Sequence, residues 1–216
     1  RMLTYLYQYG GISIYFAESI EKISDNLKEV HPHVMSVVPR LLEKVYDKIY
    51  AKGADLTGIK KRLFFWALDL GMAYKPYNEN GAFYNFKLAI ARKLIFSKWQ
   101  EGLGGELEML VSGSAALQTR LTKVFTAAGI PVMEGYGLTE TAPATNVNLP
   151  DPAGEGQAPI IPTNRRGSVG KFLPGIAIKM TDPATGDPCP IDTQGAIWLR
   201  GANVFPGYLD NRKKTD

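Results

Sequence analysis

The hydrophobic pattern of the chain alternates between short apolar runs and longer segments with helical periodicity. Apolar, β-branched runs predict strands at residues 12–16, 34–38, 107–111 and 131–133. Apolar residues repeated three and four positions apart predict helices at residues 18–30, 40–52, 59–74, 83–100 and 117–128. Because helices connect successive strands, we expect a parallel sheet with covering helices. The pattern therefore predicts the α/β fold class.

The pattern changes after about residue 148. A segment rich in proline and glycine, LPDPAGEGQAPIIPTNRR, predicts a long surface loop. Beyond it, residues 176–180 and 196–200 are typical of two strands joined by the turn-rich PATGDPCPIDTQG, which favours a hairpin. We therefore expect an α/β subdomain over residues 1–166 and part of an antiparallel β subdomain over residues 167–216.

Two loops leave the carboxyl ends of successive predicted strands. SGSAAL, residues 112–117, follows the strand at 107–111, and GYGLTE, residues 135–140, follows the strand at 131–133. In open α/β sheets, ligands bind at this edge, where the loops after the strands converge. If the two strands are near neighbours, the two loops face one ligand together.

The stretch EGYGLTET has the composition of a site for a magnesium nucleotide. Gly135 and Gly137 allow the backbone to approach a flat or phosphorylated group, and Tyr136 offers a ring on which a base can stack. Thr139 adds a hydroxyl suited to a phosphate oxygen, and Glu140 adds a carboxylate of the kind that holds Mg²⁺ together with substrate phosphates. A glycine-rich turn with a capping threonine and a solvated glutamate fits the local pattern equally well.

The stretch SGSAAL carries a weaker signal. Gly113, Ser114 and Ala115 are small enough to let an adenine or a ribose lie against bare backbone, and amides at the following helix start favour negative charge. Taken alone, a tight strand-to-helix turn with Ser114 near the N-cap is the better interpretation. A serine nucleophile is not supported, because the G-x-S-x-G motif is absent and the two histidines, His31 and His33, are remote in sequence.

In this order the two motifs resemble those of the acyl-adenylate-forming (AMP-binding) enzymes, which include acyl-CoA synthetases, adenylation domains and luciferases. EGYGLTET is similar to the family signature and VSGSAAL to its adenine-binding loop. VPRLLEKVYDKI and GGISIYFAESIEKISDNLKEVHPHV resemble the long-chain fatty acid branch, and GAIWLRGANVFPGYLDNRKKTD resembles a stretch late in the large domain. Ala196 departs from this late motif, which commonly has Glu there. The resemblance implies part of an AMP-binding large domain.

The resemblance implies a role for each residue of the two motifs. Thr139 would contact the phosphates as a catalytic residue, and Glu140 would be catalytic through the Mg²⁺ that it holds. Gly113, Ser114 and Ala115 would line the adenine pocket. The full set of nucleotide-binding residues that the resemblance implies is Gly113, Ser114, Ala115, Gly135, Tyr136, Gly137 and Thr139.

The activity implied is that of a long-chain fatty acid–CoA ligase, which uses ATP, Mg²⁺ and CoA with a long-chain fatty acid. The family's phosphate loop is expected before residue 1, and its ribose-binding aspartate and adenylation lysine after residue 216. We therefore expect residues 1–216 alone to be inactive. Two alternatives stay open: an adenylation domain for an amino acid or another carboxylate, and a non-catalytic module that binds an acyl group or a nucleotide.

Composition narrows the class of protein further. With 216 residues, 45% of them hydrophobic, the chain is long enough to bury a core. It has no run of about 18 apolar residues, which argues against a membrane-spanning helix, and Cys189 is a single cysteine. A cytoplasmic protein is predicted, with peripheral contact to a membrane as the alternative. The net charge of +4 is small, and the basic residues at 83–100 do not share one helix face, so no nucleic-acid partner is expected.

Overall fold

The computed structural model of the chain describes residues 2–77, 79–142, 144–149, 165 and 167–215. Its helices are α1 (Met2–Tyr9), α2 (Ile23–Val30), α3 (Pro39–Ala54), α4 (Gly58–Ala73), α5 (Ala82–Ala91), the π-helical η1 (Arg92–Phe96), α6 (Ser97–Gly102), α7 (Thr119–Ala127), the short turn η2 (Thr139–Thr141) and α8 (Arg212–Thr215). Its strands are β1 (Val34–Val37), β2 (Met109–Ser112), β3 (Val132–Tyr136), β4 (Asn146–Asn148), β5 (Lys171–Phe172), β6 (Ala177–Thr181) and β7 (Ala196–Arg200).

Five strands form one mixed sheet in the order β1-β2-β3-β4-β5. The first three run parallel, as predicted, with Leu110 of β2 opposite Val132 of β3. β4 and β5 then join antiparallel, so that Asn146 pairs with Tyr136 on one side and with Phe172 on the other. The predicted parallel sheet is thus extended by two strands that the hydrophobic pattern did not indicate.

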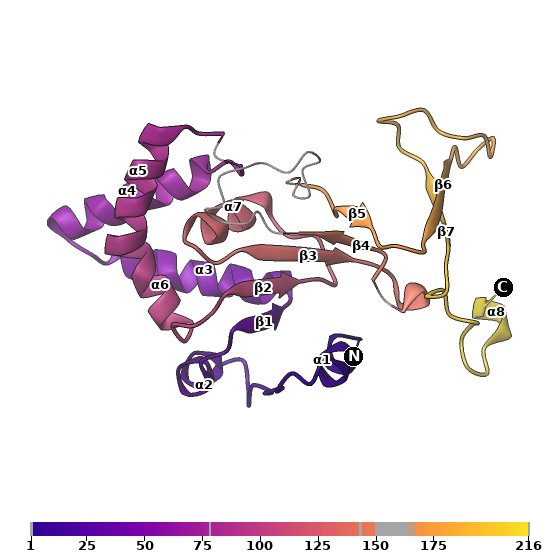
Figure 1. Ribbon diagram of the computed structural model, residues 1–216, viewed down its shortest axis with the longest axis horizontal. Helices are drawn as coiled ribbons and strands as arrows, with labels where there is room; N and C mark the ends of the chain where they lie inside the picture. The colour runs from indigo at the N-terminus through magenta and orange to yellow at the C-terminus, as the bar shows by residue number, and fades with distance from the viewer. Residues whose placement is uncertain (1, 78, 143, 150–164, 166, 216) are drawn as a thin grey trace.

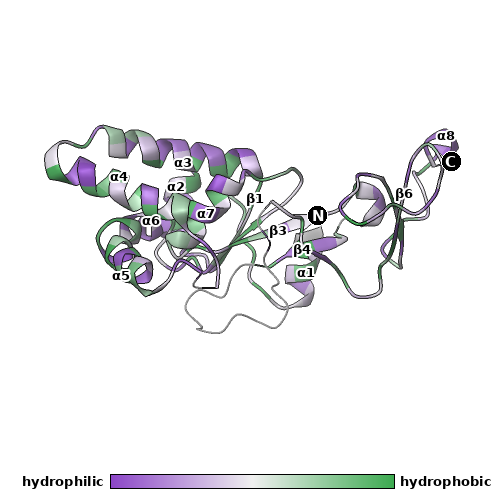
Figure 2. Cartoon of the chain, turned by 90° about the horizontal axis from the view of Figure 1, so that it is seen from above, coloured by the Kyte–Doolittle hydropathy of each residue, from purple (hydrophilic) through white to green (hydrophobic). Residues whose placement is uncertain are grey.

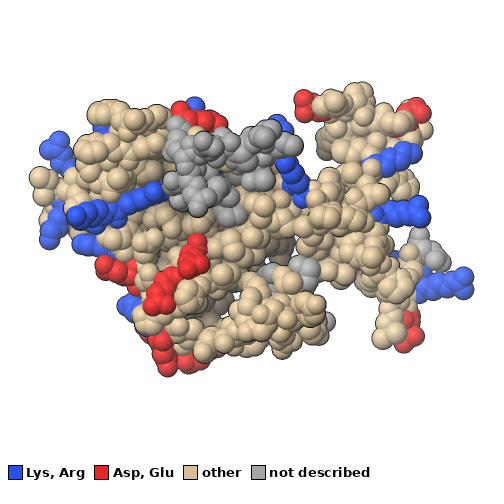
Figure 3. Space-filling view, in the orientation of Figure 1, with Lys and Arg blue, Asp and Glu red and all other residues tan. Residues whose placement is uncertain are grey.

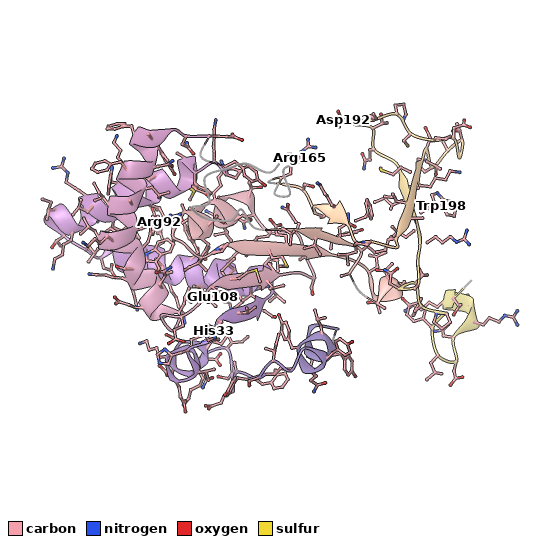
Figure 4. The ribbon with its side chains drawn as sticks, viewed as in Figure 1. His33, Arg92, Glu108, Arg165, Asp192 and Trp198 are labelled. Carbon is pink, nitrogen blue, oxygen red and sulfur yellow. The ribbon has the colours of Figure 1, made fainter. Side chains whose placement is uncertain are left out.

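The predicted hairpin is present as β6 and β7, which pair antiparallel in a second sheet. It lies at the opposite end of the molecule from α4, α5 and α6 (Figure 1). Trp198 of β7 links the two strands, because its indole Nε1 donates to Thr181 Oγ1 at 2.9 Å (Figure 4). Residues 167–216 are divided between the sheets: β5 belongs to the large sheet, and the hairpin begins at Ala177.

The hydrophobic core joins the large sheet to helices α3 to α7. Three buried rings meet edge to face there, with centroids 5.1 Å apart for Phe96 and Trp99 and 5.8 Å apart for Trp99 and Phe125. Gly71 of α4 allows α7 to approach closely, since a Cβ atom at this position would lie 3.4 Å from the Cα of Val124. Hydrophobic and hydrophilic residues are interspersed along α3, as expected for a helix that packs on one face, with Leu42 and Tyr46 buried (Figure 2).

The strand predicted at residues 12–16 is wrong, because these residues follow α1 without regular structure. A strand needs a neighbour for its backbone N–H and C=O groups, and among the described strands β1 pairs only with β2. Ile12, Tyr15 and Phe16 are exposed, so this apolar run does not enter the described core.

The helix predicted at residues 18–30 begins only at Ile23. Side chains hold the preceding residues in a turn. Asn26 Nδ2 donates to Glu18 Oε1 at 3.0 Å, Glu18 N donates to Asn26 Oδ1 at 3.2 Å, and Lys22 N donates to Ser19 Oγ at 3.3 Å. Local bonds of this kind compete with helix formation, which explains the shorter helix.

The helix predicted at residues 83–100 is continuous, but α5, η1 and α6 divide it into three geometries. Its basic side chains contribute to packing: Lys87 Nζ lies 4.2 Å from the Phe83 ring centroid, and Arg92 Nε donates to the Ala127 carbonyl oxygen at 2.7 Å (Figure 4). On the face shown in Figure 3, Lys and Arg are scattered and form no single stripe. No helix in the described part of the chain is long and apolar enough to cross a membrane.

Candidate functional site

The two glycine-containing loops lie next to each other at the carboxyl edge of the large sheet. β2 and β3 are parallel neighbours, with Ser112 opposite Glu134, so the loops that follow them start side by side. A Cβ atom at Gly113 would lie 3.4 Å from the carbonyl oxygen of Gly135. The backbones of the two stretches are therefore in contact, and the expectation that the strands are neighbours is confirmed.

The SGSAAL loop presents small, exposed residues and is anchored by a buried one. Ser114 has a φ of 72°, in the left-handed region that non-glycine residues rarely adopt. Ser114 and Ala115 are exposed, whereas Leu117 is buried. Because α7 begins only at Thr119, Ser114 is not the N-cap that the turn interpretation predicts. The loop thus offers accessible backbone rather than a helix start.

An open groove borders this loop on the side of α3. It is lined by Pro39, Arg40, Glu43, Lys44, Asp47, Ala115 and Ala116. Gln118 holds one of the acidic side chains in place, because its Nε2 donates to Glu43 Oε1 at 2.6 Å. Since both signs of charge line the groove, charge alone does not select an anion or a cation there.

The third strand of the sheet is longer than predicted, because β3 includes Glu134, Gly135 and Tyr136, which the sequence assigns to a loop. The cause is β4, the next strand along the chain, which returns antiparallel beside these residues. In addition, Thr145 N and Oγ1 both donate to the carbonyl oxygen of Tyr136, at 2.8 and 3.2 Å. The backbone of Tyr136 is therefore fixed at the end of the sheet.

The Thr-Glu-Thr sequence forms the single turn η2 directly after this edge. Thr141 fixes the start of the turn, since its Oγ1 accepts from Leu138 N at 2.9 Å and donates to Leu138 O at 3.0 Å. Ala142 follows in the left-handed region with a φ of 46°. Thr139 is exposed and Glu140 is half-buried, so both side chains are accessible.

A segment far along the chain packs against η2 (Figure 1). Phe205 N donates to the Glu140 carbonyl oxygen at 2.9 Å, and Asn203 Nδ2 donates to the Thr141 carbonyl oxygen at 2.9 Å. The hydroxyl of Tyr208 donates to Glu140 Oε1. Both the backbone and the carboxylate of Glu140 are thus held from the late segment.

The hydrogen bond from Tyr208 lowers the pKa of the Glu140 carboxyl, and the Glu140 backbone amide and the Lys214 ammonium act in the same direction. The same bond raises the pKa of the Tyr208 hydroxyl. At neutral pH, Glu140 is therefore ionised and Tyr208 is the donor. An ionised carboxylate on an accessible turn is a suitable oxygen ligand for a divalent cation.

Magnesium fits this turn only as an ion shared with a phosphate ligand. Within the described residues, no three His, Cys, Asp or Glu side chains gather in a group that could hold a metal ion. In nucleotide sites, Mg²⁺ is usually bound by one or two carboxylates together with substrate phosphates and waters. One ionised Glu140 next to the exposed hydroxyl residue Thr139 matches that donor set.

A second carboxylate, that of Glu134 in β3, contacts Thr122 of α7. Burial raises the pKa of its carboxyl, and the hydrogen bond from Thr122 opposes this effect in part, with Thr122 Oγ1 donating to Glu134 Oε1 at 3.2 Å. Its strand neighbour Ser112 is 2% exposed, and Ser112 Oγ has no hydrogen-bond partner among the described residues. The charged form of Glu134 is therefore poorly compensated in the folded state.

We expect Glu134→Gln to raise the free energy of unfolding at pH 7, by less than about 1 kcal/mol because the carboxyl is only half-buried. The folded pKa of Glu134 lies above its unfolded value, so the wild type loses stability as the pH rises through that window, and the loss persists at neutral pH. Gln carries no charge and can still accept from Thr122. Denaturant unfolding at several pH values measures the difference, which should shrink towards pH 4.

The control for this prediction is Glu21→Gln. The pKa of Glu21 is lowered, first by its backbone hydrogen bond and then by that of Ser19, so its neutral replacement should give no gain at pH 7. A Glu134→Gln variant that is less stable than the wild type at pH 7 and unchanged at pH 4 would contradict the assigned burial penalty.

The sequence model of the family described as "AMP-binding enzyme" matches residues 1–209. The chain belongs to the AMP-binding enzyme family. Long-chain fatty acid–CoA ligase 5 of Rattus norvegicus is 33% identical to this AMP-binding chain over 213 residues, which are 97% of the chain and 28% of the relative. Long chain acyl-CoA synthetase 3 of Arabidopsis thaliana is 32% identical over 220 residues, 100% of the chain and 31% of the relative. The chain therefore spans about 30% of the length of these curated relatives.

Solved structures show the fold of this AMP-binding chain. A long-chain fatty acid–CoA ligase from Archaeoglobus fulgidus gives a TM-score of 0.60 at 15% identity, covering 99% of this chain and 34% of that one. Apo MatB from Rhodopseudomonas palustris gives a TM-score of 0.59 at 22% identity, covering 99% and 31%. At these identities the likeness establishes the fold, and it confirms the predicted α/β class.

The sequence did not predict that Asn203, Phe205 and Tyr208 of this AMP-binding chain form hydrogen bonds with η2. The late motif containing them predicts the family but assigns them no place in the site. Because Glu140 and Tyr208 are 68 positions apart in the chain, no local pattern indicates their contact.

Proposed function

We propose that residues 1–216 form the adenylate- and magnesium-binding part of a long-chain fatty acid–CoA ligase. The observation that carries the proposal is the meeting of the SGSAAL and GYGLTE stretches at one sheet edge, with an ionised Glu140 on the turn that follows. The substrate class comes from the names of the curated relatives, to which the chain is similar over nearly all of its length.

The proposed roles follow from accessibility and chemistry. The exposed, small-residue backbone at Ser114 and Ala115, next to Gly113, would receive the adenine. Tyr136, whose backbone is fixed at the strand end, would stack on the base. Gly135 and Gly137 would shape the loop around it, with Gly137 also near the acyl carbonyl. The exposed hydroxyl of Thr139 would contact the phosphates, and Glu140 would hold Mg²⁺.

In the proposed reaction, the fatty carboxylate attacks the α-phosphate of ATP to give acyl-AMP and pyrophosphate, and the thiol of CoA then displaces AMP to give the thioester. Because the substrate carboxylate is itself the nucleophile, residues of this chain contribute by positioning and by electrostatics. The loop backbone and Tyr136 would orient the nucleotide, and the Thr139 hydroxyl would donate to a phosphate oxygen. Mg²⁺, when bound at Glu140, would neutralise phosphate charge.

Residues 1–216 by themselves are proposed to bind the nucleotide without completing the reaction. The chain spans 28% to 31% of the two curated relatives. The groups that bring the α-phosphate and the fatty carboxylate together are therefore expected in the remainder of a full-length enzyme.

Calorimetric titration of the 216-residue chain with AMP, and a pyrophosphate-release assay with palmitate and ATP, test this function. We expect saturable AMP binding, weakened roughly tenfold by Tyr136→Ala through the loss of base stacking, and no pyrophosphate release above background. Phe83→Ala removes an exposed ring on α5 and is the matched control, with AMP affinity equal to that of the wild type. AMP affinity unaffected by Tyr136→Ala would overturn the nucleotide site, and sustained pyrophosphate release would overturn the proposed inactivity.

The alternative substrates are distinguished by competition. A non-hydrolysable palmitoyl-adenylate analogue should displace AMP more effectively than a phenylalanyl-adenylate analogue if the chain belongs to a fatty acid ligase. The reverse order would favour an amino-acid adenylation domain. A non-catalytic binding module would be indicated if a full-length enzyme containing these residues bound AMP but released no pyrophosphate with any carboxylate.

A further inference from the structure

Tyr208 is remote in sequence from the proposed metal ligand, yet its hydroxyl donates to Glu140 Oε1. We propose that Tyr208 is a positioning residue, which fixes the Glu140 carboxylate in the orientation that receives a divalent cation. The proposal rests on the nucleotide and metal site proposed above and adds to it a residue outside both motifs. It also assigns a role to the late stretch VFPGYL, which the two loops leave unexplained.

The late segment holds the backbone of η2 at two points and the chain after η2 at a third. Phe205 N donates to the backbone oxygen of Glu140, and Asn203 Nδ2 donates to the backbone oxygen of Thr141, both at 2.9 Å. Asn203 Nδ2 also lies 3.5 Å from the carbonyl oxygen of Ala144. Because the backbone on which Glu140 sits is fixed, the hydrogen bond from Tyr208 restricts the remaining freedom, which is the rotation of the side chain.

Tyr208 is itself held firmly enough to act in this way. Its ring meets that of Phe205 edge to face, with centroids 4.9 Å apart, and Lys214 Nζ lies 5.2 Å from its centroid. Its backbone N donates to Thr215 Oγ1 at 3.0 Å. Gly207 makes this arrangement possible, because a Cβ atom there would lie 2.4 Å from Thr215 Cγ2. The hydroxyl is therefore presented by a fixed ring and not by a freely rotating side chain.

The chemistry of the contact suits a metal ligand. A hydroxyl donating to a carboxylate makes a charge-assisted bond that favours the ionised form of the acid. An ionised carboxylate has about four lone-pair sites, so one bond from Tyr208 leaves acceptor capacity for a cation. A ligand that is already oriented loses less freedom on binding, which strengthens the binding of the cation.

The test uses the 216-residue chain and Mn²⁺ with ATP, with the relaxation of water protons as the measure of binding. Tyr208→Phe removes the hydroxyl and keeps the ring, and we expect it to weaken Mn²⁺–ATP binding roughly 3- to 10-fold while AMP affinity stays unchanged. Tyr84→Phe is the matched control: Tyr84 also donates its hydroxyl, to the Leu70 carbonyl oxygen at 2.6 Å, but lies among the helices. This control should leave both affinities as in the wild type.

A double variant separates positioning from a general structural role. In a Glu140→Gln background the ligand to the cation is already lost, so adding Tyr208→Phe should cause no further weakening of Mn²⁺–ATP binding. Equal losses in both backgrounds, or a parallel loss of AMP affinity, would assign Tyr208 a merely structural role and overturn the proposal. If the wild type binds AMP but Tyr208→Phe leaves the Mn²⁺–ATP affinity unchanged, the positioning role alone is overturned. Failure of the wild type to bind AMP would overturn the proposed function as well.

Discussion

Replacing Glu140 by Gln is expected to slow acyl-adenylate formation by on the order of 100-fold in the full-length enzyme that we propose contains these residues. Gln has nearly the same size and can still accept from Tyr208, so the turn should keep its geometry. The substitution removes the negative charge, and with it the oxygen ligand best suited to Mg²⁺. Palmitate-dependent exchange of pyrophosphate into ATP, measured over a range of Mg²⁺ concentrations, checks this expectation.

Glu21→Gln provides the control for the loss of charge. Glu21 also has a lowered pKa, caused first by its backbone and then by Ser19, but it lies just before α2, in a segment with no proposed role in the site. Its exchange rate should match that of the wild type. Full activity of Glu140→Gln at limiting Mg²⁺ would remove Glu140 from the metal site.

Replacing Gly170 by Ala is expected to destabilise the fold by about 3 kcal/mol or more. Gly170 has a φ of 81°, which an L side chain rarely adopts, and a Cβ atom there would lie 2.1 Å from Val147 O and 2.3 Å from Asn148 N. Both are backbone atoms of β4, so β4 and β5 would have to separate. Urea unfolding followed by circular dichroism measures the loss.

Gly186→Ala separates the steric clash from the unfavourable backbone angle. Gly186 has a similar φ of 78°, but a Cβ atom there would meet nothing within 4 Å. It should therefore cost only about 1 kcal/mol, the cost of the left-handed conformation. Equal losses for the two variants would show that the contact between Gly170 and β4 contributes little to stability.

Much of the α/β architecture could be predicted because its strands and helices carry their own periodic signal. Residues 34–37, 109–111 and 132–133 lie in strands within runs that the apolar pattern indicates, and 119–127 has helical spacing ended by Gly129. The neighbouring positions of the SGSAAL and GYGLTE stretches then followed from the general rule that loops converge at the carboxyl edge of a parallel sheet.

The rest depends on contacts between distant residues, which the local pattern does not contain. β4 has the sequence NVN, whose two asparagines are 2% and 1% exposed, and its pairing with β3 and β5 makes it a strand. The opposite case is Ile12 to Phe16, an apolar run with strand character that has no pairing among the described strands. The hydrogen bond between Tyr208 and Glu140 was not predicted for the same reason, because the two residues meet only when the late segment folds back on η2.

The pairing of Tyr136 with Asn146 affects how far the length of the connection between β3 and β4 can vary among related proteins. Both ends of the connection between β3 and β4 are fixed at this pair by main-chain bonds, which nearly any side chains allow. Once the ends are fixed, a longer connection costs little additional free energy. A change in the length of this connection therefore need not shift the register of the sheet. It is restricted instead at η2, because the late segment holds Glu140 and Thr141 in place, so length changes are expected outside Thr139–Thr141.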